Sequence, residues 1–201
     1  MEAKIKNPIT DINQLNFDKF YTYADYLTWQ FKERVELFKG RIHKMSPAPN
    51  TNHQRVSREM SVLFSKVFKH KSCEYFVAPF DVRLKDSKKP ITDSDYNTII
   101  QPDLCIICDE SKLDEQGCVG SPDLVVEILS SGNSKKEMGE KFELYLENKI
   151  KEYWIVDPAN QSVLVYQLNN NQYINTKPLT VDDELQSELF PELKFKVSDI
   201  F

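Results

Sequence analysis

The sequence predicts a single α+β (or α/β) domain, and two patterns support this. Short runs rich in β-branched and aromatic residues dominate the middle and the end of the chain. Two segments with helical periodicity accompany them, one before the central strands and one among them. With 201 residues, the chain has the length of one domain and can bury a core without disulfide or metal crosslinks.

The first third of the chain is expected to contain an arm, a hairpin and a long helix. Residues 1–20 are polar and predict an N-terminal arm, followed by a short helix over 21–29. Residues 35–45 alternate around Lys39-Gly40, which predicts a β-hairpin. Over residues 52–70 the period changes to that of an amphipathic helix. Its apolar stripe consists of Val56, Met60, Leu63, Phe64 and Val67.

The remainder is expected to form the central sheet and a second hairpin. The run at 124–129, which follows Pro122, is apolar except at Glu127, as in a strand that is covered on both faces. Ser134 and Glu137 have the spacing of a capping box that begins the second helix. The other predicted strands cover residues 75–84, 99–108 and 152–156, and the C-terminal hairpin joins 162–168 to 172–174.

Charge and hydropathy exclude some classes of protein. Lys and Arg number 26 and Asp and Glu number 31, so the net charge is −5. This argues against a general nucleic-acid coat protein, although not against a protein that meets DNA at a small local site. No apolar run approaches about 18 residues, and the N-terminus lacks the apolar stretch of a secretory signal. We therefore expect a cytoplasmic protein that does not enter a membrane.

The four cysteines are expected to be thiols in such a compartment. They are Cys73, Cys105, Cys108 and Cys118. Cys105 and Cys108 form a C-x-x-C pair, but inside a strand this spacing directs the two side chains to opposite faces. Buried structural cysteines are therefore favoured over a zinc site.

Three charged residues occur at positions where a charge would not be expected to stabilise the fold. Asp103 opens an apolar strand, Glu127 interrupts the apolar run at 124–129, and Lys141 borders the packed face of the second helix. A buried carboxylate costs several kcal/mol unless it is paired, protonated or bound to a metal. Two carboxylates can hold a hard divalent cation, and a lysine can orient or help deprotonate an attacking water.

Each residue alone also has a structural interpretation. Glu127 could pair with a neighbouring basic residue, Asp103 could accept hydrogen bonds from backbone amides at the strand entry, and Lys141 could extend its charge to solvent along the surface. Their occurrence together favours the functional interpretation.

The ordered set of motifs resembles the PD-(D/E)xK nuclease superfamily and, more closely, its Uma-two family of restriction endonuclease-like proteins. The resemblance runs from about Val35 to the C-terminus. It rests on VELFKGRIHKMSP, the His53-Gln54-Arg55 helix start, APFDVRL, QPDLCIIC, PDLVVEILS, GEKFELYLENKIKEYWIVDP and LKFKVSDIF.

This resemblance implies a restriction-endonuclease-like core, in which a mixed β-sheet is flanked by helices. It also implies a DNA endonuclease that hydrolyses phosphodiester bonds with Mg²⁺ or Mn²⁺, often as a homodimer. Asp103 and Glu127 match the superfamily's acidic positions and are the expected metal ligands. The x-K position is Leu129, so the lysine role is assigned to Lys141 as the best candidate. Lys135 and Lys136, at the helix start, are better suited to contact phosphate. The alternative is a non-catalytic or regulatory nucleic-acid-binding module that retains the fold.

Four further residues are candidates for supporting roles. Glu36 is either a third carboxylate or an exposed hairpin residue, and His53 is either a site-facing or a satisfied half-buried histidine. Gln101 is suited to contact a phosphate or support Asp103, and Tyr145 either packs or hydrogen-bonds in the site. Asp81 is favoured as a structural residue.

The positions of the basic residues predict how the protein would bind DNA. They gather in the first hairpin, in the loop after residue 84 and at the second helix start, namely at Lys39, Arg41, Lys44, Lys85, Lys88, Lys89, Lys135 and Lys136. If they surround the acidic centre, DNA is bound transiently, at one cleft and in a salt-sensitive way.

Overall fold

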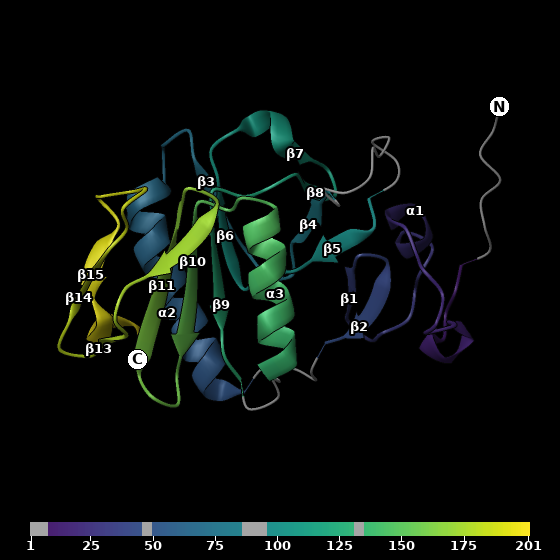
Figure 1. The fold of residues 1–201 in the computed structure, drawn as a ribbon, viewed down its shortest axis with the longest axis horizontal. Coiled ribbons are helices and arrows are strands. Elements are labelled where there is room, and N and C mark those ends of the chain that lie inside the picture. The colour runs from purple at the N-terminus through teal and green to yellow at the C-terminus, as the bar shows by residue number, and fades with distance from the viewer. Residues whose placement is uncertain (1–7, 46–49, 86–95, 131–134) are drawn as a thin grey trace.

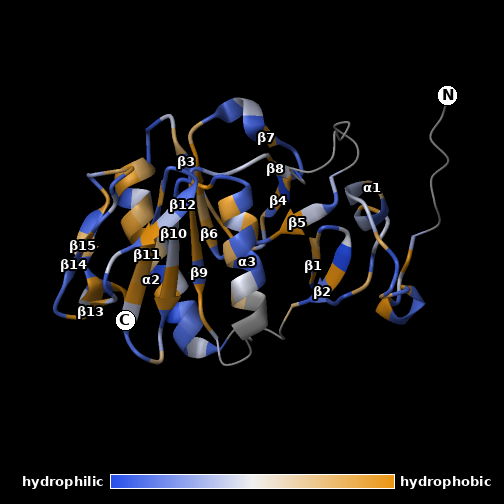
Figure 2. Cartoon of the chain, in the orientation of Figure 1, coloured by the Kyte–Doolittle hydropathy of each residue, from blue (hydrophilic) through white to orange (hydrophobic). Residues whose placement is uncertain are grey.

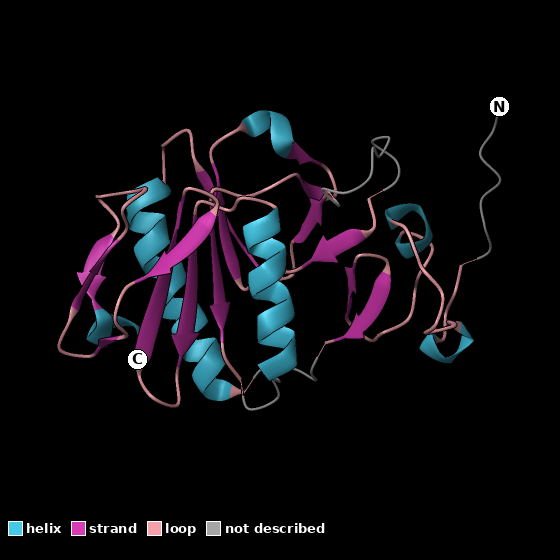
Figure 3. Cartoon of the chain, in the orientation of Figure 1, coloured by secondary structure: helices cyan, strands magenta, loops and turns pink. Residues whose placement is uncertain are grey.

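Strands and a few helices make up the chain, as Figure 3 shows. The computed structural model describes residues 8–45, 50–85, 96–130 and 135–201, without the side chains of 135–137. The predicted capping box of Ser134 and Glu137 and the side chains of Lys88, Lys89, Lys135 and Lys136 lie outside the described residues. In the described part of the chain, no helix is long and apolar enough to cross a membrane.

The helices agree with the predicted periodicity. The α-helices are α1 (Tyr23–Tyr26), shorter than expected, α2 (Thr51–Phe68) and α3 (Lys135–Glu147), and the 3₁₀ turns are η1 (Ile12–Gln14), η2 (Glu110–Lys112) and η3 (Val197–Ile200). Asn50 caps α2, because its side-chain oxygen accepts from the His53 N–H at 2.9 Å.

Two large sheets carry most of the strands, and β14 and β15 form a separate two-stranded sheet. The first has the order β2-β1-β5-β4-β8-β7, and the second has β12-β11-β10-β9-β6-β3, with β13 paired to β11. Most neighbours are antiparallel, whereas β9 and β10 run parallel, so the central sheet is mixed as predicted. The strands are β1 (Val35–Phe38), β2 (Arg41–Lys44), β3 (Glu74–Val77), β4 (Asp81–Leu84), β5 (Thr98–Ile100), β6 (Leu104–Ile107), β7 (Leu113–Asp114), β8 (Gly117–Val119), β9 (Leu124–Ile128), β10 (Glu152–Asp157), β11 (Ser162–Asn169), β12 (Gln172–Asn175), β13 (Leu179–Thr180), β14 (Glu184–Gln186) and β15 (Lys194–Lys196).

The expectation of continuous strands over 75–84 and 99–108 was wrong. Each segment bends and contributes one strand to each sheet: β3 and β4 flank Ala78-Pro79, and β5 and β6 flank residues 101–103. Both breaks contain a proline, which cannot donate a ladder hydrogen bond. The bends lie side by side, since the Ala78 N–H donates to the Asp103 carbonyl at 3.0 Å. The two bends, at residues 78–80 and 101–103, form the corner between the two sheets, and Asp103 lies at this corner.

The central sheet is covered on both faces, as the apolar run at 124–129 predicted. Helix α2 packs Val56, Met60 and Phe64 on the face that carries Val126 and Trp154. Helix α3 covers the other face, where Leu144 and Tyr145 meet Cys105, Val125 and Tyr153. In Figure 1, α2 and α3 lie on either side of β9 and β10, and Figure 2 shows these strands as largely apolar.

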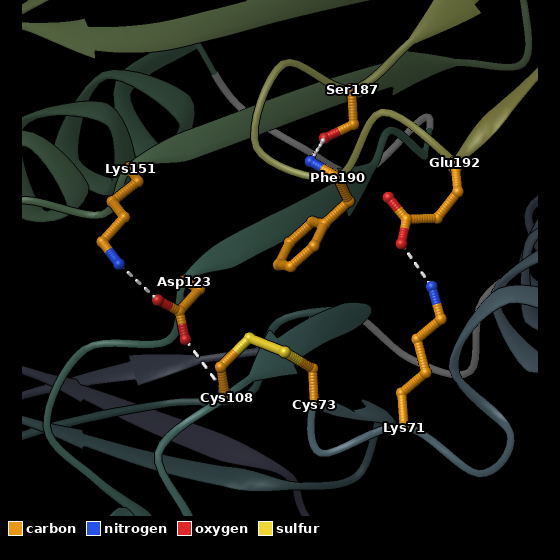
Figure 4. Close-up of a disulfide and its surroundings, with 8 residues drawn as sticks. All are labelled: Lys71, Cys73, Cys108, Asp123, Lys151, Ser187, Phe190 and Glu192. Atoms are coloured by element: carbon orange, nitrogen blue, oxygen red, sulfur yellow. Dashed lines mark hydrogen bonds and ion pairs between the residues drawn. A yellow bond between two sulfur atoms is a disulfide. The ribbon is translucent and has the colours of Figure 1, made fainter.

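A disulfide joins Cys73 to Cys108, so the expectation of four thiols was wrong. The β3–β6 register pairs Glu74 with Ile107, which brings the next two residues, Cys73 and Cys108, face to face with a Cα–Cα distance of 3.9 Å. Figure 4 shows the bond beside Asp123, which accepts from the Cys108 N–H. Cys105 and Cys118 are buried free thiols. Burial raises the pKa of both, that of Cys118 to about 12.

We expect reduction of this disulfide to lower the free energy of unfolding by about 3–4 kcal/mol, because the bond closes a loop whose ends are 35 residues apart. Urea unfolding with and without dithiothreitol measures the loss. A Cys73→Ala/Cys108→Ala variant is the control, since its unfolding should not respond to the reductant. Equal stability of the oxidised and reduced wild-type protein would contradict the prediction.

Candidate nuclease site

Elements from both sheets and both long helices converge at the corner. Strand β1 pairs with β5, which places Glu36 beside the start of the Gln101-Pro102-Asp103 bend. Strand β9 supplies Glu127 and helix α3 supplies Lys141 and Tyr145, one turn apart. Residues distant in the sequence thus form one polar cluster within the apolar layers.

Lys141 is the centre of this cluster. Its Nζ lies 2.9 Å from Glu127 Oε1 and 3.3 Å from Glu36 Oε1, and the residue is only 7 % exposed. Burial opposes its charge, but the two carboxylates outweigh burial and raise the pKa of Lys141 above its usual value. The interpretation of Lys141 as a surface lysine and that of Glu36 as an exposed hairpin residue are therefore both wrong, since Glu36 is 2 % exposed.

Burial and neighbouring charges shift the pKa of the Glu127 carboxyl group. Burial, followed by the nearby carboxylates of Asp103 and Glu36, raises the pKa of Glu127 to about 7, although Lys141 acts in the opposite direction. The hydroxyl of fully buried Tyr145 donates to the same oxygen, Oε1, that Lys141 contacts. Tyr145 therefore both packs and hydrogen-bonds in the cluster.

Asp103 lies across the strand pair from Glu127. Leu104 is paired with Val126 in the β6–β9 register, so the preceding Asp103 is opposite Glu127. Its Oδ2 accepts from the Ile128 N–H at 2.7 Å, and its Oδ1 lies 3.1 Å from His53 Nε2. His53 is buried at the N-terminal end of α2, and its Nδ1 has no hydrogen-bond partner among the described residues.

Gln101 joins the cluster as a buried positioning residue. Its backbone N–H donates to Glu36 Oε1 at 2.8 Å, and its side-chain Nε2 donates to Asp81 Oδ1 at 2.8 Å. The guanidinium of Arg34 donates to the Gln101 Oε1 at 2.7 Å. With these partners, the Gln101 amide is directed toward Arg34 and Asp81. Sequence reasoning missed Arg34, which is one arginine before a hairpin and carries no motif.

Asp81 is held inside this second network. Burial raises the pKa of Asp81, while the hydrogen bond from Gln101 opposes the shift. Arg83, two residues along β4, pairs instead with Asp114. The contacts of Asp81 support the structural interpretation.

The donor set fits a hard divalent cation. The side chains of Asp103 and Glu127 are 20 % and 12 % exposed, so both reach the surface of the corner. Both hydrogen bonds to Glu127 use Oε1, and no described residue donates to Oε2. The described residues contain no group of three or more His, Cys, Asp or Glu arranged around a metal position. Two carboxylates with water and phosphate oxygens are nevertheless a usual set for Mg²⁺.

The architecture is that of a restriction-endonuclease-like fold. A crystal structure described as a putative nuclease belonging to DUF820, from Anabaena variabilis, superposes with a TM-score of 0.69, covering 90% of this chain and 97% of that one. At 20% identity, this likeness concerns the fold.

A family model matches residues 23–198 and carries the description "Putative restriction endonuclease". The chain belongs to this family, Uma2. It is also similar to two Synechocystis proteins of uncharacterized function. It is 28% identical to slr1290 over 150 residues, which are 73% of this chain and 74% of slr1290. It is 28% identical to sll1609 over 174 residues, which are 84% of this chain and 93% of sll1609.

Proposed function

We propose that this protein is a divalent-metal-dependent endodeoxyribonuclease whose active site consists of Asp103, Glu127 and Lys141. The observation that carries the proposal is the placement of Lys141 from α3 against Glu127, with Asp103 opposite Glu127 on the neighbouring strand. Membership of a family described as restriction endonucleases supports DNA as the substrate.

In this proposal, Asp103 and Glu127 hold Mg²⁺ or Mn²⁺ through their carboxylate oxygens. The cation would polarise the phosphodiester and acidify a water molecule. Lys141 stays protonated between two carboxylates, so it donates hydrogen bonds to the attacking water or to a phosphate oxygen and offsets developing negative charge. Glu36 and Tyr145 position Lys141 and Glu127, and His53 orients Asp103.

The chain offers a matched test of Asp103. Pro-Asp-Leu occurs at residues 102–104 and again at 122–124, and each aspartate precedes a strand of the central sheet. We expect Asp103→Asn to slow nicking of plasmid DNA with Mg²⁺ or Mn²⁺ by about 10²-fold, because one charged ligand is lost. Asp123→Asn should cut at the wild-type rate, since Asp123 contacts Lys151 and the Cys108 N–H at the other end of β9.

Two results would overturn the assignment. The first is cleavage by Asp103→Asn that is as fast as cleavage by the wild type. The second is an equal loss of cleavage rate in Asp103→Asn and Asp123→Asn. If calorimetry shows Mn²⁺ binding but neither DNA nor RNA is cleaved, the non-catalytic module is favoured. The absence of a lysine at position 129 is the sequence observation that supports this alternative.

We also propose that the protein forms a homodimer, which the family resemblance supports. Sedimentation velocity tests this proposal.

A further inference from the structure

A groove of about 530 Å³ lies beside the proposed catalytic cluster, between the β1–β2 hairpin and α3. Its lining includes Phe20, Phe38, Arg41, His43, Gly139 and Glu140. Figure 1 shows the hairpin and α3 as neighbours. The volume is in the range of small-ligand sites, about 300–1,000 Å³.

The hairpin wall of the groove lies on the strand face that also carries Glu36 of the cluster. In the β1–β2 register, Glu36 is directly opposite His43, so their side chains share a face, and Phe38 shares it two residues further along β1. On α3, Glu140 Oε2 lies 3.6 Å from His43 Nδ1, so this pair joins the α3 wall to the hairpin wall. A group seated in the groove would therefore lie next to the cluster.

Planar groups dominate the hairpin wall. The Phe38 and His43 rings stack with centroids 4.1 Å apart, and the Arg41 guanidinium lies 4.0 Å above the Phe20 ring. Phe20 is 61 % exposed, yet it is held in place by the hairpin turn. Gly40, at φ 83°, allows this contact, because a Cβ there would lie 3.0 Å from Phe20 Cδ1.

The α3 wall of the groove contains a glycine, Gly139. Gly139 lies inside a helix, where glycine costs about 1 kcal/mol relative to alanine. A Cβ at Gly139 would meet no described atom within 4 Å, so packing does not require this glycine. A side chain larger than alanine at this position would extend into the groove.

We propose that this groove binds an unpaired nucleobase of the DNA strand presented to the catalytic cluster. Rings and a guanidinium plane stack on the face of any base. Lys39 and Arg41 at the hairpin offset the charge of the acidic α3 wall. The proposal rests on the proposed nuclease function and adds how the substrate strand is held.

The test is fluorescence anisotropy of a labelled single-stranded oligonucleotide at low salt, in EDTA and again with Ca²⁺. We expect Gly139→Leu, which fills the groove, and Phe20→Ala, which removes a stacking face, each to weaken binding by about tenfold. Gly139→Ala should bind like the wild type. Phe17→Ala is the matched aromatic control, because Phe17 is also exposed and lies under a lysine but does not line the groove. A strand of the same length with abasic positions should bind the wild type about tenfold more weakly.

The outcomes separate this proposal from the nuclease proposal. Folded Gly139→Leu and Phe20→Ala variants that bind like the wild type would overturn the base site, as would equal binding of intact and abasic strands or binding of neither. Because Leu is a better helix former than Gly, lost binding in Gly139→Leu is not explained by a weaker helix, and thermal unfolding checks this. Failure of cleavage would count against the nuclease alone, since anisotropy requires no turnover.

Discussion

Replacing Glu127 with glutamine is expected to reduce metal-dependent DNA cleavage by at least about 10³-fold. The amide keeps the size of the side chain but removes the charge that would hold the cation and that pairs with Lys141 at 2.9 Å. Initial rates of plasmid nicking over a Mn²⁺ titration measure the effect. A variant that recovers the wild-type rate at high Mn²⁺ would show that Glu127 affects affinity only.

Glu152 provides the matched control for this experiment. It is also a buried strand glutamate, but it lies at the start of β10, opposite Leu124, whereas Ile155 is opposite Glu127. Its oxygens accept from Trp154 Nε1 at 2.7 Å and from the Ser187 hydroxyl and the Leu189 N–H at 3.0 Å. We expect Glu152→Gln to lose stability but to cut at the wild-type rate. Equal loss of cleavage in both variants would mean that buried charge in this sheet matters only for folding.

Replacing Lys141 with methionine is expected to lower the free energy of unfolding by about 3–5 kcal/mol, because it leaves the carboxylates of Glu36 and Glu127 buried without their cation. Urea unfolding measures the loss. Lys151→Met is the control, since Lys151 pairs with Asp123 through a side chain that is 61 % exposed, and its loss should cost about 0–1 kcal/mol.

A second substitution separates stability from chemistry at Lys141. Glu36→Gln in the Lys141→Met background removes one uncompensated charge and should recover part of the stability. Cleavage should stay low, because the donor next to Glu127 is still missing. A Lys141→Met protein as stable as the wild type would contradict the buried ion pairs, and recovery of cleavage in the double variant would contradict the role of Lys141 in the site.

Much of the fold follows from local patterns. The alternation around Lys39-Gly40 and the turn Asn169-Asn170-Asn171 predicted the two hairpins. In the structure, both turns contain residues with positive φ. The period of Val56, Met60 and Phe64 predicted α2. The bends at Pro79 and Pro102 were missed because a proline inside an apolar run shows where a ladder is interrupted but not whether the chain then changes sheets.

The disulfide, like the two bends, could not be predicted from the sequence alone. Cys73 and Cys108 face each other only when the β3–β6 register is known, and a sequence does not specify how two separated strands align. The same holds for Arg34, whose contact with Gln101 joins residues far apart in the chain.

By itself, the sequence determined the mixed α+β class, the two covered faces of the central sheet and the residues whose polarity conflicts with their apolar surroundings, Asp103 and Glu127. These follow from periodicity and from the cost of burying charge, which are local properties. Only the tertiary structure decided that Lys141 is buried between Glu36 and Glu127, because this depends on how α3 packs against strands from both sheets. We propose that Lys141, which the packing of a helix places beside Glu127, takes the role of the lysine that the x-K position lacks.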